Sequence, residues 1–235
     1  MSPAGGTITV LAGAVLLRLT LSGTYTRYVR AGMGPWLVLA AVVLIVLGVV
    51  TVVRALRGAR TTEVHDDGHK HGSGPGVGWL LLAPIAALLL VAPPTLGSYG
   101  VDRGAAVDVR AGARTFAPLP AGEGPVPMTL LEFGQRAFDH GGATLDDASV
   151  QLTGFVADNA RGGFRLARYQ IACCAADAAP VVVRVVGVEG SPPPRDAWVT
   201  VTGSLRPGGE DDDGDIPVLA ATSVVEIPAP DDPYE

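Results

Sequence analysis

The chain has 235 residues, a length that allows one membrane region and one domain of ordinary size. Its mean hydropathy is positive, at +0.36, despite 31 glycines and 19 prolines, which indicates apolar spans joined by loops and excludes one large soluble core. Residues 1–100 carry a net charge of +4 and residues 101–235 a net charge of −10. The acidic second half argues against nucleic acid as a partner, because phosphate binding needs a basic face.

Three apolar runs in the first 100 residues predict three transmembrane helices. The clearest is Trp36–Val53, which has eighteen residues without a charge. Thr7–Leu21 is a weaker span, in which Arg18 lies near one end and serves either as an interfacial anchor or as a functional charge. Trp79–Leu96 is the third span, and Pro84 is expected to kink it.

Positive charge beside these spans predicts their orientation. The loop after the second span holds four positive charges, and the loop before it holds two. They are Arg54, Arg57, Arg60 and Lys70 after it, and Arg27 and Arg30 before it. Because the more positive loop faces the cytoplasm, we expect a multi-pass protein of the plasma membrane with residues 98–235 outside.

A linker and a short helix are expected next. Tyr99–Pro127 is rich in Gly, Ala and Pro, as extended linkers are. Thr129-x-x-Glu132 forms a capping box ahead of an apolar face, which predicts a helix over Leu130–Phe138. The tail Pro228–Glu235 is expected to be loosely held. The predicted division is a membrane domain over 1–98, a linker over 99–127, an extracytoplasmic domain over 128–228 and a tail over 229–235.

Five runs of alternating or β-branched residues predict five strands. They cover Ser149–Asp158, Gly163–Cys174, Val181–Val188, Ala197–Leu205 and Pro217–Ile227. Gly154 is expected at a bend, because strongly curved strands need glycine or a bulge. We therefore predict a small five-stranded barrel of the OB type. It departs from that fold at Gly187–Asp196 (GVEGSPPPRD), which cannot form the usual helix, so the helix at Leu130–Phe138 is expected to plug the barrel.

The two cysteines of the chain, Cys173 and Cys174, are neighbours. In a regular strand their side chains point to opposite faces, whereas a local bulge would bring both to one side. Three interpretations stay open: metal binding together with Asp177, a reducible vicinal disulfide, and two small buried hydrophobic side chains. His140 is the one histidine in the predicted outer domain and a candidate for a further ligand.

A His-rich stretch is the second candidate metal site. His65, His69 and His71 lie in the loop between the second and third spans, which is either a low-affinity metal site or a solvated loop. Glu210–Asp215 (EDDDGD) superficially resembles a calcium loop, but Ile216 stands where the required glycine belongs, which favours a solvated loop. The sequence has no P-loop, GxSxG or HExxH motif, and we expect no catalysed reaction.

Several segments carry a resemblance to a known family. They are Leu16–Val29 (LLRLTLSGTYTRYV), the His-rich loop, Leu152–Val156 (LTGFV) and Ala167–Pro180 (ARYQIACCAADAAP). Through them the chain resembles the YcgQ-like bacterial membrane proteins, a family of unknown function. The resemblance covers most of the chain and implies a partner role beside a predicted permease, in metal handling. It implies no catalytic residues.

The expected function is therefore a non-enzymatic accessory subunit of a membrane permease system that handles metal, with zinc as the candidate ion. Its expected partners are the lipid bilayer and a permease subunit. The alternative is a membrane-anchored thiol oxidoreductase or cofactor chaperone that uses Cys173 and Cys174. A third possibility is an assembly factor in which both clusters are incidental. A redox role needs accessible sulfurs, whereas a metal role needs convergent ligands.

Overall fold

The computed structural model describes residues 3–58, 95–110, 116–119, 124–158, 163–188, 190–206 and 216–235. The chain divides into two compact units, Met1–Pro94 and Thr95–Glu235. The third predicted span falls almost wholly on residues outside this described part. The same holds for the His-rich loop and for Glu210–Asp215.

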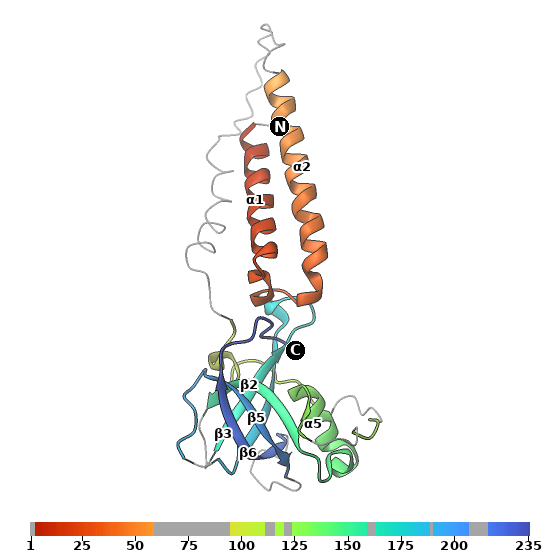
Figure 1. Cartoon of the computed structure of the whole chain (residues 1–235). Helices are drawn as coiled ribbons and strands as arrows, with labels where there is room; N and C mark the ends of the chain where they lie inside the picture. The colour runs from red at the N-terminus through yellow and green to blue at the C-terminus, as the bar shows by residue number, and fades with distance from the viewer. Residues whose placement is uncertain are drawn as a thin grey trace. The chain divides into compact units, whose positions relative to one another are not determined.

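The described part of the first unit is a helical hairpin. Helix α1 (Pro3–Leu21) and helix α2 (Gly34–Gly58) lie side by side (Figure 1), joined by the short 3-10 helices η1 (Thr24–Arg27) and η2 (Ala31–Met33). The two helices approach closely at glycine, since a Cβ on Gly13 would lie 2.9 Å from the carbonyl oxygen of Ala41. In the turn, the Tyr25 hydroxyl donates a hydrogen bond to the Ala31 carbonyl at 2.8 Å.

Both helices are long and apolar enough to cross a membrane. The most apolar 18-residue window has a mean hydropathy of 1.6 in Ala4–Leu21 and of 3.0 in Ala31–Arg57. Large apolar side chains on α2 are exposed within the unit, among them Leu39, Val46 and Leu56. The predicted spans Thr7–Leu21 and Trp36–Val53 therefore correspond to real helices, and the unit is compatible with membrane anchoring.

The second unit is built on a six-stranded mixed sheet. The strands are β1 (Val126–Pro127), β2 (Val150–Asp158), β3 (Gly163–Gln170), β4 (Ala179–Val186), β5 (Trp198–Leu205) and β6 (Val218–Ile227). Their order is β1-β2-β3-β4-β6-β5, and β2 pairs with β5 as well, so five strands pair in a closed ring. The pairs β1–β2 and β4–β6 are parallel, and the rest are antiparallel.

The five longer strands lie where alternation predicted them, with two differences. β1 was not predicted, because two residues that include a proline show no strand pattern and stand in the expected linker. The expected strand Gly163–Cys174 ends at Gln170 instead, because the chain turns at Ala172–Asp177. At Gly154 a Cβ would lie 2.7 Å from the carbonyl oxygen of Ala167, so glycine allows the close approach of β2 to β3.

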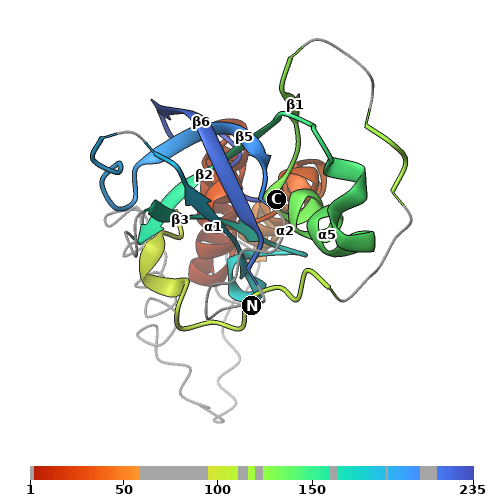
Figure 2. The same cartoon turned by 90° about the horizontal axis from the view of Figure 1, so that it is seen from below.

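Alternate residues of the same strands form two hydrophobic clusters on opposite faces. The larger cluster includes Val156, Leu166 and Val199, and helix α5 (Leu130–Phe138) adds Leu130 and Phe133 to it. α5 lies beside the strands in Figures 1 and 2. Of the valines expected in the core, Val185, Val199 and Val201 are buried there, and Val182 packs against the second cluster.

The second cluster lies on the other face of β2, β3 and β5. Phe155 stacks on Tyr169 and meets Trp198 edge to face, both with ring centroids 5.8 Å apart. Val101, from the segment expected to be a linker, and Tyr234, from the tail, complete it. Val101 and Tyr234 are each about 95% buried, so the parts of the chain that contain them belong to the folded domain.

The tail differs from the expectation that it is loosely held. The amide of Glu235 donates to the Tyr169 carbonyl at 2.9 Å, and the amide of Ile171 donates to the Glu235 carbonyl at 3.2 Å. The Arg168 guanidinium donates to the Asp232 carbonyl at 2.7 Å. Backbone pairing and an arginine hold this segment, and neither shows in its polar, proline-rich sequence.

Two side chains cap the start of α5. Thr129 Oγ1 accepts from the Glu132 amide at 3.0 Å, which is one half of the predicted capping box. The Glu132 carboxylate does not complete the box but accepts from Arg136 Nε at 2.9 Å. The carboxylate of Glu235 accepts from the amides of Leu130 and Leu131 at 2.9 and 3.2 Å. The tail thus satisfies amides that a helix start leaves without partners.

We expect Glu235→Ala to lower the free energy of unfolding of this unit by about 1–2 kcal/mol, the usual cost of losing a helix cap. Burial raises the pKa of the Glu235 carboxyl above its ordinary 4.5, so the stability linked to its titration is present at low pH and lost as pH rises through the raised pKa. The penalty of the substitution is therefore larger at pH 4.5 than at pH 7. Urea unfolding of the full chain in detergent at both pH values measures it, and a penalty that grows with pH would contradict the expectation.

Candidate metal centre

The connection between β3 and β4 folds around one carboxylate. After Gln170 the chain leaves the sheet, and the short 3-10 helix η5 (Ala175–Asp177) returns it to β4. The Asp177 carboxylate accepts from the amides of Ala172 at 3.0 Å and Cys173 at 2.9 Å, and the Asp177 amide donates to the Cys174 carbonyl at 3.0 Å. These bonds fix a tight turn in place of a continued strand.

The turn brings both sulfurs to one side. The Sγ atoms of Cys173 and Cys174 are 3.6 Å apart, and the ligand atoms of Cys173, Cys174 and Asp177 all lie within 4.8 Å of one another. Cys173 is exposed and Cys174 is half-buried, both as free thiols. The interpretation of two buried hydrophobic side chains does not fit this exposure, whereas the predicted ligand trio is brought together.

Asp177 also affects the charge state of Cys173. The Cys173 thiol hydrogen-bonds to the Asp177 carboxylate and to Cys174, which raises the pKa of Cys173 from 9.0 to about 12. The same thiol, followed by the backbone amides, lowers the pKa of Asp177. At neutral pH the turn therefore holds an ionised carboxylate beside a protonated Cys173 thiol, and a metal that binds there must displace a proton.

Asp177→Asn is expected to speed alkylation of Cys173 by iodoacetamide at pH 7 by about 10- to 30-fold. Loss of the negative acceptor returns the Cys173 pKa toward 9.0, which raises the thiolate fraction by about 10³ but lowers intrinsic nucleophilicity by about 30-fold. Peptide mass spectrometry over time measures the rate. Asp146→Asn, at an exposed position of the same unit, is the control, and equal rates in the two variants would contradict the role assigned to Asp177.

The other predicted ligands are not brought to this turn. His140 is exposed on the 3-10 helix η4 (Asp139–Leu145), where its Nδ1 lies 2.7 Å from Asp139 Oδ1, and it is not part of the trio. His65, His69 and His71 lie outside the described residues. Within the described part of the chain, the trio supplies three protein ligands.

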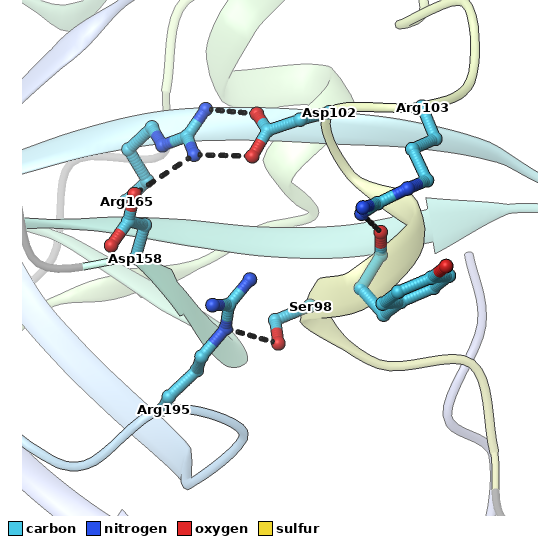
Figure 3. A network of polar contacts seen from close by, with 7 residues as sticks. Ser98, Asp102, Arg103, Asp158, Arg165 and Arg195 are labelled. Carbon is cyan, nitrogen blue, oxygen red and sulfur yellow. Dashed lines mark hydrogen bonds and ion pairs between the residues drawn. The ribbon is translucent and has the colours of Figure 1, made fainter.

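A separate polar network ties residues 95–104 to the sheet (Figure 3). The Arg165 guanidinium donates to both oxygens of Asp102, at 2.7 and 3.0 Å, and this lowers the pKa of Asp102. Arg195 Nε donates to Ser98 Oγ at 2.7 Å, and the amide of Ser98 donates to Asp196 at 2.7 Å. The sequence did not predict this network, because its partners are about 60 to 100 positions apart in the chain. It holds the segment over the aromatic cluster of β2, β3 and β5.

Two domains of one known family match most of the chain. Residues 6–104 match the DUF1980 N-terminal domain, and residues 143–235 match the DUF1980 C-terminal domain. The chain belongs to the DUF1980 family. The resemblance to YcgQ-like proteins is consistent with this membership. The C-terminal DUF1980 domain contains strands β2 to β6 and the Cys173–Cys174 turn, whereas the N-terminal DUF1980 domain contains α2 and most of α1. Among curated proteins, none matches the chain.

Proposed function

We propose that this DUF1980 protein is a non-enzymatic accessory subunit of a membrane permease system and binds a thiophilic metal ion, zinc being the candidate, at Cys173, Cys174 and Asp177. The convergence of three ligand atoms within 4.8 Å carries the proposal. A fixed turn, rather than chance proximity in a flexible loop, holds them, because the Asp177 carboxylate accepts hydrogen bonds from the amides of Ala172 and Cys173.

The spacing of the sulfurs suits zinc. With Zn–S bonds of about 2.3 Å and tetrahedral angles, two sulfurs on one ion lie about 3.8 Å apart. The observed 3.6 Å separation is close to that value, so little rearrangement is needed. Thiolates are also preferred ligands of copper(I). With three protein ligands, the fourth position of a zinc ion is open to water or to a partner's side chain.

We assign the strand ring to the OB type. When the ring is numbered from β2 as its first strand, the strand order is 1-2-3-5-4-1, and the third and fifth strands (β4 and β6) are parallel. Both features are typical of the OB fold. OB barrels bind nucleic acid on the face of their second and third strands, but here Val101 and Tyr234 cover part of this face. Together with the acidic charge, this covering supports the proposal that the domain does not bind nucleic acid.

We propose a plasma-membrane location with the sheet domain outside. Two apolar helices support anchoring in the lipid bilayer, and we propose the apolar run Trp79–Leu96, most of which lies outside the described residues, as a third span. Arg54 and Arg57 at the end of α2 favour the cytoplasm for that end. A permease subunit is the proposed partner. The test is a reporter fused after Glu235 that works only in the cytoplasm. Activity of this reporter would rule the topology out.

The thiol oxidoreductase is the weaker candidate. Reactive cysteines have thiol pKa values lowered below about 8.5, whereas the pKa of Cys173 is raised to about 12. A thiol kept protonated is a poor nucleophile in disulfide exchange. Exposure of Cys173 satisfies one requirement of redox chemistry, but the raised pKa of its thiol opposes the other.

Zinc titration of the full chain in detergent, under reducing conditions, tests the proposed function. Because the His-rich loop is a second possible binder, the background carries His65→Ala, His69→Ala and His71→Ala. In this background we expect about one zinc per chain with the cysteines intact and none with Cys173→Ser and Cys174→Ser. Since the chain has two cysteines, every thiol-dependent signal belongs to this turn. Identical zinc binding with and without the cysteines would remove the site.

A further inference from the structure

We propose that the Cys173–Cys174 turn also binds trivalent arsenic or antimony hydroxides, as a chelate between the two sulfurs. This inference rests on the proposed thiol site and specifies a second class of ligand for it, a neutral metalloid hydroxide rather than a cation. Three features of the turn support it: the number of donors, the spacing of the sulfurs and their access to solvent.

The number of donors matches a pyramidal metalloid. Within the described residues, the group consists of Cys173, Cys174 and Asp177, with one ligand atom each. Structural zinc takes four protein ligands, so these three leave its sphere incomplete. Trivalent arsenic and antimony keep a lone pair and bind three ligands in a pyramid. Two sulfurs with one oxygen, from hydroxide or carboxylate, complete that sphere.

The sulfurs are placed to bind one atom together. They lie 3.6 Å apart on a turn that three hydrogen bonds to Asp177 hold in shape. Because the second sulfur is already beside the first, the second bond forms within one molecule at high effective concentration. Sulfur is also the soft ligand that such centres prefer over oxygen and nitrogen.

The reaction balances without an oxidant. In each of two steps a thiol displaces one hydroxide from As(OH)₃: an As–S bond forms, an As–O bond breaks, and the thiol hydrogen leaves with the hydroxide as water. The product carries two As–S bonds and one remaining As–OH group, and neither arsenic nor sulfur changes oxidation state. Exposure of Cys173 gives the hydroxide access to the first sulfur.

The test uses sodium arsenite with the full chain in detergent, in the background that lacks His65, His69 and His71. The protein is reduced with a phosphine, since dithiol reductants would themselves chelate arsenic. Intact-mass spectrometry is expected to show one adduct per chain, with the mass of an As–OH group less two hydrogens. Cys173→Ser and Cys174→Ser, made singly, should each weaken arsenite binding at least tenfold, because each removes the chelate. Arsenite should also release zinc from zinc-loaded protein.

The outcomes separate the two proposals. Cysteine-dependent zinc binding without an arsenic adduct would overturn the metalloid inference and leave the proposed function standing. An adduct that persists in the double serine variant, or one that either single variant forms as well as the parent, would also overturn it. Failure of both ligands to bind through the cysteines would remove the inference and the proposed metal site together.

Discussion

The zinc affinity of the Cys173–Cys174 turn is expected to fall about 100-fold when the pH is lowered from 7 to 6. Zinc binds thiolates, so each sulfur that coordinates it must lose its proton. The pKa of Cys173 is raised to about 12 by its hydrogen bond to Asp177, which keeps this thiol protonated across the whole interval. Two displaced protons give a tenfold change each per pH unit.

Competition with a chelator of known zinc affinity, at pH 6, 6.5 and 7, measures this dependence. The histidine-free background is needed, because imidazole protonation near pH 6 would add its own loss of affinity. Calorimetry in two buffers of different ionisation enthalpy counts the released protons independently, and about two per zinc are expected. A change below tenfold over the interval would mean that Cys173 does not bind as a thiolate. The double serine variant gives the baseline without the site.

Asp177→Asn separates two roles of this carboxylate in the same assay. If Asp177 is a zinc ligand, the variant binds zinc more weakly at every pH. If Asp177 acts by holding Cys173 protonated, the variant binds zinc more tightly, because less work is needed to remove the proton. Proximity within 4.8 Å leads us to expect the first result.

The strands were predictable because one face of each is buried. Alternation at Val150–Asp158 and β-branched runs at Val181 and Val199 reflect contacts that repeat every second residue, which a sequence displays directly. β1 and the ordered tail were not predictable. Their stability comes from pairing with distant residues, such as Tyr169 with Tyr234, and no local pattern encodes such a pairing.

The candidate site was likewise predictable only in part. For Cys173, Cys174 and Asp177 the sequence left metal binding as one of three interpretations, because spacing alone does not fix the direction of the sulfurs. Their convergence depends on backbone amides that turn toward Asp177, a side chain four residues after Cys173. The segment that covers the aromatic cluster is held by the ion pair between Asp102 and Arg165, which are 63 positions apart in the chain. Contacts of this kind become visible only in three dimensions.

Phe133→Ala is expected to lower the free energy of unfolding of the sheet domain by about 3–5 kcal/mol. Phe133 has no exposed surface and lies in the larger cluster together with residues of β2 through β6. Its removal leaves a cavity that the paired strands cannot close, because their backbones are held by hydrogen bonds around the ring. Helix α5 contributes Leu130 and Phe133 to this cluster, so the loss falls on the core itself.

Phe138→Ala on the same helix is the matched control. Phe138 is half-buried at the edge of the cluster, under the guanidinium of Arg110 at 4.4 Å, and its truncation should cost at most about 1.5 kcal/mol. The unfolding is followed by Trp198 fluorescence in a background with Trp36→Phe and Trp79→Phe, which leaves one tryptophan, in the second cluster. Equal losses in the two variants would mean that α5 packs outside the core and does not fill the ring. A large loss of unfolding free energy in Phe133→Ala alone would establish that the helix belongs to the same cooperative unit as the strands.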